Sequence, residues 1–216
     1  MEQTQEKGLK QKIITAARQV LLSDGYRNFS LRKVARKIEV SATSIYLHFE
    51  NKDDLVHTLI DEAIQRLNKQ LKQSVQPSVD PIKNLNSLAN EYVSFAFKYP
   101  REYQIIYLIS SDEMSRYPKA KFRKARKGYE MVTSVLEEGV KAGLIEEEHP
   151  RLAAYIFWAQ LHGVMSVVLS KRLDTRIDQQ AFIQESIDHI ISGYRVRTAL
   201  ESKKPSEGQG DDPSRH

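Results

Sequence analysis

The chain has 216 residues, a formal net charge of +5 and no cysteine. Its length suffices for a sizeable core, and the lack of cysteine excludes disulfides and thiol catalysis and agrees with a cytoplasmic location. The excess charge is local: residues 1–52 hold ten Lys and Arg against five Asp and Glu, while residues 53–216 hold 23 of each. A phosphate backbone is the partner that such a basic segment favours, although a solvated charged face is the alternative.

The N-terminal residues are polar and lack the apolar core of a signal peptide. The most apolar window, residues 153–169, is interrupted by Gln160, His162 and Ser166, so we expect no membrane span and a soluble protein. Apolar side chains recur with helical period along nearly the whole chain, and no run alternates as a half-buried strand does. This pattern predicts an all-α fold of about nine helices.

The first expected helix covers residues 7–23, with Gly25 as its stop signal. Residues 30–49 then predict two short helices joined by a tight turn. The first places four apolar residues on one face, and Ser41 is the expected N-cap of the second, which buries Ile45. The four residues of the apolar face are Leu31, Val34, Ala35 and Ile38.

A fourth helix is expected to begin at the capping residue Asn51, with Asp53 and Asp54 beside the positive end of its dipole. It is long enough to link an N-terminal module to the rest. The polar break at residues 76–81 ends in Asp80 and Pro81, which is a helix start.

Three more helices are expected to carry most of the aromatic residues: one from Pro81 to Pro100, one around residues 103–107, and one that follows a loop and runs to Gly143. Two terminal helices, at residues 150–172 and 179–198, are broadly apolar. Because the first of them is apolar on nearly all sides, we expect the pair to form half of a four-helix bundle that a second copy of the chain completes. Residues 201–216 are polar and are expected to be a disordered tail.

One set of N-terminal residues has the types and spacing of a known class of DNA-binding head. The set is Gly25, Phe29, Ser30, Val34, Ala35, Val40, Ser41, Ile45, Tyr46, His48, Phe49, Asn51, Lys52 and Leu55. On these residues the chain resembles the TetR family of bacterial transcriptional regulators over about its first 55 residues. Further along, Trp158, His162 and Gly163 resemble the Trp-His-Gly signature of one class of C-terminal domain in that family.

The resemblance implies a homodimer whose heads enter successive major grooves of a double-stranded DNA operator and whose body binds a small molecule. The corresponding domains are residues 1–52 for the helix-turn-helix, 53–76 for a connecting helix and 77–200 for effector binding and dimerisation. The second short helix of a helix-turn-helix meets base edges with its N-terminal residues, here Ala42, Thr43 and Ser44, and the capping residue Ser41 belongs to the same expected DNA-binding set.

Further DNA contacts are expected around these residues. Arg32 is placed to reach a guanine edge, and Lys33 a phosphate. By resemblance, Ser30, Tyr46, His48 and Lys52 contact phosphates, which positions the head without specifying sequence. The alternatives are a half-buried ring for Tyr46 and a solvated side chain for His48. One departure is Glu39, because the family commonly has glycine there, where the chain tends toward positive φ.

An aromatic set in the C-terminal body is expected to line a pocket for an apolar or aromatic effector, since buried tyrosine hydroxyls need partners. The alternative is that these side chains are ordinary core residues. The set is Tyr92, Phe95, Tyr99, Tyr103, Tyr107, Phe122, Tyr129, Trp158 and His162.

Evidence for an enzyme is weak. The six histidines form no metal-ligand spacing, and the chain has no glycine-rich phosphate loop, so we expect no metal, cofactor or catalytic residue. The leading hypothesis is a repressor that an effector releases from a palindromic operator. The alternatives are a DNA-binding regulator without a small ligand, either protein-responsive or an activator, and a helical enzyme.

Overall fold

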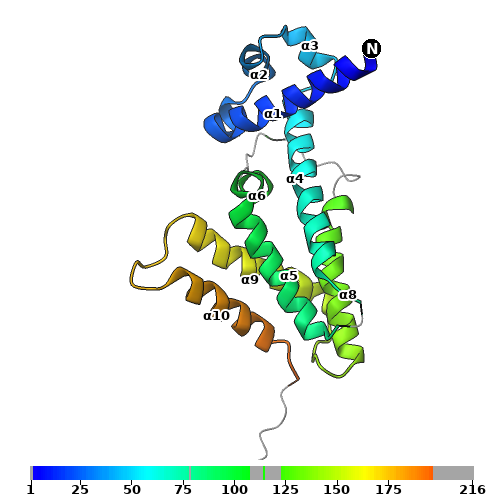
Figure 1. Cartoon of the computed structure of the whole chain (residues 1–216), viewed down its shortest axis with the longest axis vertical. Helices are drawn as coiled ribbons and strands as arrows, with labels where there is room; N and C mark the ends of the chain where they lie inside the picture. The colour runs from blue at the N-terminus through cyan, green and yellow to red at the C-terminus, as the bar shows by residue number, and fades with distance from the viewer. Residues whose placement is uncertain (1, 78, 108–113, 115–122, 197–216) are drawn as a thin grey trace, which may run out of the picture.

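The computed structural model describes residues 2–77, 79–107, 114 and 123–196. These residues form nine helices, so the predicted all-α fold is confirmed. Figure 1 shows a small head at one end of the long axis and a larger body at the other. The helix α4, Lys52–Ser74, runs from the head along the body.

The head consists of α1 (Glu2–Asn28), α2 (Leu31–Lys37) and α3 (Ala42–Tyr46). The first helix differs from the prediction in two details: it starts earlier than residue 7, and Gly25, the predicted stop signal, does not end it. Gly25 interrupts it with φ 71 and ψ 170, and one more helical turn follows to Asn28. The glycine therefore breaks the helix where expected without ending the helical segment, because positive φ costs glycine little.

Two separate hydrophobic cores share α4. Its first half gives Leu55, Val56 and Leu59 to the head core, and its second half gives Leu67 and Leu71 to the body core. The N-terminal cap of α4 is the predicted one, because the Asn51 side chain accepts a hydrogen bond from the Asp54 backbone N–H at 2.9 Å.

The body is built from five helices that pack on one another and on α4. They are α5 (Pro81–Lys98), α6 (Pro100–Tyr107), α8 (Lys127–Lys141), α9 (Pro150–Leu169) and α10 (Gln179–Ser192). The predicted start of α5 is confirmed: Asp80 caps the helix through the Ile82 N–H, and Pro81 occupies its first turn.

Two predicted boundaries in the body are wrong. The helix that begins at Pro150 ends at Leu169 rather than near residue 172, since Lys171 takes a φ of 55. The last helix ends at Ser192 rather than near residue 198. Its chain turns at Tyr194 and pairs with the loop after α8, where the Glu146 N–H donates to the Tyr194 carbonyl at 3.1 Å and an isolated bridge joins Ile145 and Arg195.

The prediction that no segment is apolar enough to span a membrane is also wrong by length and composition. The helix α9 meets both criteria, and no other described helix does. In this fold α9 packs against α5, α8 and α10, and it buries Phe157, Leu161 and Met165. A core helix of a helical bundle passes the same test, so this composition alone is weak evidence for a membrane.

Candidate nucleic-acid interface and ligand cavity

The first short helix of the head, α2, is fixed by its N-cap and by its apolar face. Ser30 is extended, and its hydroxyl accepts a hydrogen bond from the Lys33 backbone N–H at 3.3 Å. The helix buries Leu31, Val34 and Ala35 in the head core, so its remaining side chains face solvent. Arg32, Lys33, Arg36 and Lys37 are all exposed, which gives α2 a cationic outer face.

The turn between α2 and α3 has the conformation that the family resemblance implies, although Glu39 stands where the family commonly has glycine. Glu39 takes a φ of 58, in the left-handed region where glycine is common. The turn is held by backbone hydrogen bonds, because Val40 N–H donates to the Ala35 carbonyl at 3.1 Å. A non-glycine residue in this region costs about 1 kcal/mol, and the flanking Ile38 and Val40 are partly buried against the head core.

The second short helix, α3, presents the residues expected to meet base edges. Ser41 caps it by accepting a hydrogen bond from the Ser44 N–H at 3.1 Å, and the two hydroxyls lie 2.8 Å apart. Ile45 anchors the helix with none of its side chain exposed, whereas Ser41 and Thr43 are exposed. Ala42 and Ser44 are half-buried at the same end.

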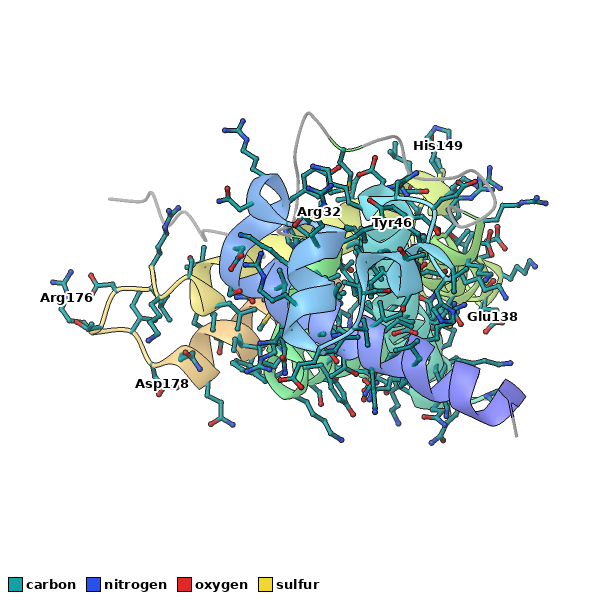
Figure 2. The ribbon with its side chains drawn as sticks, turned by 90° about the horizontal axis from the view of Figure 1, so that it is seen from above. Arg32, Tyr46, Glu138, His149, Arg176 and Asp178 are labelled. Carbon is teal, nitrogen blue, oxygen red and sulfur yellow. The ribbon has the colours of Figure 1, made fainter. Side chains whose placement is uncertain are left out.

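Tyr46 and Leu47 project from the end of α3, with 55% and 80% of their surfaces exposed. Figure 2, which looks onto the head, shows Arg32 and Tyr46 on its outer side. Tyr46 therefore does not have the half-buried position that was its alternative. His48 is half-buried and follows Leu47. An exposed aromatic ring with a terminal hydroxyl is a suitable donor to a phosphate oxygen.

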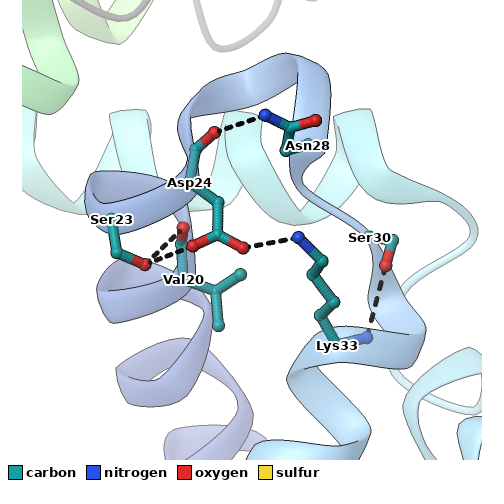
Figure 3. A network of polar contacts seen from close by, with 6 residues as sticks. All are labelled: Val20, Ser23, Asp24, Asn28, Ser30 and Lys33. Atoms are coloured by element: carbon teal, nitrogen blue, oxygen red, sulfur yellow. Dashed lines mark hydrogen bonds and ion pairs between the residues drawn. The ribbon is translucent and has the colours of Figure 1, made fainter.

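Lys33 is not free in this structure, as Figure 3 shows. Its ammonium lies 2.6 Å from the Asp24 carboxylate at the end of α1. Hydrogen bonds from Lys33 and from the Ser23 hydroxyl hold the pKa of Asp24 below its ordinary value. Asn28 donates to the Asp24 carbonyl at 3.3 Å. These contacts join the end of α1 to the start of α2.

Lys52, at the start of α4, is also oriented by the head. Its ammonium lies 4.2 Å from the centre of the Tyr26 ring, a cation–π contact. The Tyr26 hydroxyl in turn donates to the Asp53 carboxylate. The charged groups of Lys52 and Asp53 thus both contact Tyr26 of α1 at the N-terminal end of α4.

A cavity of about 390 Å³ lies between helices of the body, is partly open to solvent and is mostly apolar. It is bordered by α4, α6, α8 and α9, together with Met114 and the residues just before α8. Its walls are His57, Ile60, Ile64, Leu67, Asn68, Ile106, Tyr107, Met114, Ala125, Arg126, Gly128, Tyr129, Tyr155 and Trp158.

The aromatic residues next to this cavity pack against one another. The Trp158 ring lies 4.6 Å from that of Tyr92 and 5.8 Å from that of Tyr129, and Tyr129 stacks on Tyr155 at 4.2 Å. The Tyr103 hydroxyl lies 2.7 Å from Nδ1 of His162. Burial raises the pKa of Tyr92, Tyr103 and Tyr107 and lowers that of His162, so these groups favour their neutral forms.

One polar atom in the cavity wall lacks a partner. Trp158 Nε1 is buried and has no hydrogen-bond acceptor among the described residues. An unsatisfied buried donor costs about 1–3 kcal/mol, so this N–H is a candidate contact for a polar atom of a bound molecule.

The predicted ligand residues fall into three groups. Tyr107, Tyr129 and Trp158 line the cavity. Tyr92, Tyr103 and His162 do not line it, but they contact Trp158 or Tyr107 directly. Phe95 and Tyr99 pack together away from the cavity, with Phe95 in the body core, and Phe122 lies outside the described residues.

Several residues that line the cavity were not predicted from the sequence, above all those on α4. His57, Ile60 and Ile64 recur at helical spacing, as a second stripe beside the one that packs into the cores. That second stripe was a usable signal, because a helix with one buried face carries one stripe. Gly128 gave no such signal, since its role depends on the side chains opposite it.

The outer side of α9 carries exposed apolar side chains. Leu152, Tyr155 and Ile156 are each more than 40% exposed, although they belong to the most apolar helix of the chain. A methyl group at Gly163, further along α9, would meet no described atom within 4 Å. The single chain therefore covers α9 on one side only.

Among the described residues, no group of three or more His, Asp or Glu side chains is placed to hold a metal ion. What the fold does present is a compact head with an exposed, capped helix-turn-helix, joined by one long helix to a body with a partly open apolar cavity. This architecture defines the chain as a helical DNA-binding transcriptional regulator.

Two family models identify the particular class. One, described as bacterial regulatory proteins of the tetR family, matches residues 13–59, and the other, described as a tetracyclin repressor-like C-terminal domain, matches residues 85–190. Together they cover more than two thirds of the chain. The chain belongs to the TetR family, as its first 55 residues predicted.

Named relatives match most of the length of this chain at low sequence identity. The chain is 22% identical over 183 residues to the fatty acid metabolism regulator protein of Bacillus subtilis strain 168, covering 84% of this chain and 93% of the relative. The structure of FadR from Bacillus subtilis in complex with stearoyl-CoA has a TM-score of 0.68 at 19% identity, covering 86% of this chain and 100% of that one.

A second solved structure agrees. The fatty acid degradation regulator FadR from Bacillus halodurans has a TM-score of 0.67 at 23% identity and covers 84% of this chain and 93% of its own. At these identities the likeness concerns the fold.

Proposed function

We propose that the chain is a homodimeric repressor that binds a palindromic DNA operator and leaves it when a molecule with a long apolar chain fills the body cavity. The observation that carries this proposal is the position of the cavity against α4 and α6. Both helices also enter the head core, α4 through Leu55 and Leu59 and α6 through Ile105. A ligand that moves either helix therefore moves the head.

The effector class is supported by the cavity walls and by the relatives. The walls are mainly aliphatic and aromatic, which suits an apolar chain, since each buried CH₂ contributes about 0.8 kcal/mol. The relatives regulate fatty acid metabolism, and one was solved with stearoyl-CoA. We therefore propose a fatty acyl group as the apolar part of the effector.

We propose that the head binds the operator. In this proposal Ser41, Ala42, Thr43 and Ser44 meet base edges, and Arg32 reads a guanine. The phosphate contacts come from Ser30, Lys33, Tyr46, His48 and Lys52, and Lys33 leaves Asp24 to make its contact.

The dimer is assigned to the outer faces of α9 and α10. The exposed Leu152, Tyr155 and Ile156 support this, because a second copy would cover them. The proposal places the protein in the cytoplasm with the DNA and gives it no catalytic step.

Selection of an operator from a random DNA library, followed by gel shift at two salt concentrations, tests the proposal. We expect selective binding that weakens as salt rises, and release of the DNA by palmitoyl-CoA or palmitate. Arg32→Ala should relax base preference, whereas Lys52→Ala should weaken binding to every sequence alike. Selective binding that no fatty acyl compound changes would favour the alternative, a regulator that responds to a protein partner or acts as an activator.

A further inference from the structure

One part of the cavity wall carries a hydrogen-bond donor and a hydrogen-bond acceptor that no described residue satisfies. The donor is the indole N–H of Trp158, a residue that is only 6% exposed. The acceptor is Asn68 Oδ1, to which no described group donates. Both residues line the cavity, so the two groups border one apolar space.

Gly128 shows how close the two groups are. A Cβ atom at this glycine would lie 2.9 Å from Asn68 Oδ1 and 3.7 Å from Trp158 Cζ2, so both atoms lie within 4 Å of one point of the cavity wall. Cζ2 is on the same edge of the indole ring as Nε1, because both are bonded to Cε2. A single small polar group at this place can therefore reach the donor and the acceptor together.

The acceptor is held in place by its own amide. Asn68 Nδ2 donates to the Lys124 carbonyl at 3.0 Å, which assigns the two ends of the amide and leaves Oδ1 on the opposite side. The surroundings are apolar, since Leu67 lines the cavity and Leu71 Cδ1 lies 3.8 Å from the Gly128 position. An unpaired donor and acceptor in such surroundings favour a ligand atom that bonds to both.

The two groups lie at the end of the cavity that is away from the head. Among the α4 residues that line the cavity, His57 is nearest to the head and Asn68 is farthest from it. These two positions are about 16 Å apart along the helix axis, at about 1.5 Å per residue. An apolar chain that runs along α4 can therefore fill the cavity while a polar substituent on it meets Trp158 and Asn68.

We infer that Trp158 and Asn68 form a hydroxyl-binding site, and that the apolar chain of the effector carries a hydroxyl group; this inference rests on the function proposed above. A hydroxyl accepts a hydrogen bond from Trp158 Nε1 and donates one to Asn68 Oδ1, so it satisfies both groups. A carbonyl or carboxylate oxygen only accepts, and it would face the Asn68 oxygen without a proton between them. An unsubstituted chain would leave both groups unpaired, which makes Trp158 a specificity-determining residue for a hydroxylated acyl chain.

Binding of palmitate and of three hydroxypalmitates to the full-length protein tests the inference. The hydroxypalmitates carry the hydroxyl next to the carboxylate, at mid-chain or at the chain end, so that one of them places it beside Trp158. We expect the best of them to bind at least about tenfold more tightly than palmitate, and to release the operator at a correspondingly lower concentration.

The indole N–H of Trp158 supplies a direct readout that needs no variant. Trp158 is the only tryptophan of the chain, so it gives one indole signal in a proton–nitrogen correlation spectrum of the labelled protein. A hydrogen bond from this N–H moves its proton signal downfield. We expect that shift with the best hydroxypalmitate and not with palmitate, whereas a role of Trp158 in packing alone would give no such difference.

Two variants should remove the preference for the hydroxylated chain. Trp158→Phe deletes the donor and keeps an aromatic ring, and Gly128→Ala places a methyl group within 4 Å of both polar groups. The matched control is Phe157→Leu, which trims the preceding aromatic residue of α9. Phe157 is buried and does not line the cavity, so its variant should retain the preference. Circular dichroism shows whether each variant is folded.

Equal affinity for palmitate and all three hydroxypalmitates, an indole signal that the hydroxyl does not move, or an unchanged preference in Trp158→Phe would each overturn the inference. If palmitate still releases the operator in those cases, the proposed function stands. Failure of every compound to bind would instead refute the acyl effector itself, and the hydroxyl site with it.

Discussion

In the head, most core side chains are aliphatic or small, the rings of Tyr26, Phe29 and Phe49 are buried among them, and the cationic side chains of α2 are exposed. In the body, aromatic side chains and polar atoms line a partly open cavity, and Trp158 Nε1 is buried without a described partner. The head is thus a rigid support whose function lies on its exposed surface. The body gives up part of its packing to keep space for a ligand. Mutations should therefore separate the two functions, because DNA binding depends on a filled core and effector binding on an unfilled space.

The strongest test of this contrast is Ile45→Ala in the head core. Ile45 is fully buried and anchors α3, so its truncation should lower the free energy of unfolding by about 2–5 kcal/mol. Operator affinity should fall sharply, because α3 loses its orientation, while effector affinity should change much less. Urea unfolding and fluorescence anisotropy with labelled operator measure the two effects.

Leu47→Ala is the matched control, since Leu47 follows on the same segment and is 80% exposed. Its unfolding free energy should change by less than about 0.5 kcal/mol. If the Ile45 and Leu47 variants were equally stable, the head would not depend on a filled core.

The differing predictability of the two regions has the same physical origin. The caps at Ser41 and Asn51 follow from local chemistry, because each depends on residues within one turn, whereas the positive φ at Glu39 was implied by the family resemblance. The cavity brings together α4, α6, α8 and α9, so its members depend on long-range packing. Phe95 and Trp158 are both aromatic residues within apolar helices of the sequence. Phe95 nevertheless packs in the core away from the cavity, whereas Trp158 lines the cavity.

The next largest effect is expected from filling the cavity with Gly128→Leu. Even a methyl group there would lie 2.9 Å from Asn68 Oδ1 and 3.7 Å from the Trp158 ring, so a leucine side chain must take up cavity space. The effector concentration that releases half of the operator should rise at least about tenfold, with operator affinity little changed.

Gly128→Ala gives a graded control, because it adds one methyl group and should reduce the response less. A normal effector response in the leucine variant would show that the ligand binds elsewhere. It would then favour a regulator whose cavity has no ligand role.

A smaller effect is expected at the head surface from Asp24→Asn. The substitution removes the carboxylate 2.6 Å from Lys33 and so frees that ammonium for phosphate. Affinity for unspecific DNA should rise about three- to fivefold and its salt dependence should steepen, since an exposed ion pair holds the ammonium only weakly and its loss adds one free cation to the head. Titration of a random-sequence duplex at several salt concentrations measures both.

Glu50→Gln is the control for net charge alone, because Glu50 is an exposed acid of the head whose side chain makes no described contact with Lys33. An equal rise in both variants would mean that total charge, not the release of Lys33, sets unspecific affinity. The Asp24 contact would then have only a structural role.

The smallest expected effect concerns His162, the titratable group that packs on the aromatic cluster of the body. Burial lowers its pKa below 6.5, so the unfolded chain takes up a proton at higher pH than the folded one. The stability that the neutral imidazole contributes is therefore present above about pH 6.5 and is lost as the pH falls from there through the folded pKa. The urea midpoint should fall more between about pH 7 and pH 5 in the unmodified protein than in His162→Gln, whereas His149→Gln, at an exposed site, should retain the full dependence. Parallel curves for the protein and His162→Gln would show that the body tolerates a charged imidazole beside Tyr103, and the contrast between an apolar ligand-binding body and a charged DNA-binding head would not extend to this cluster.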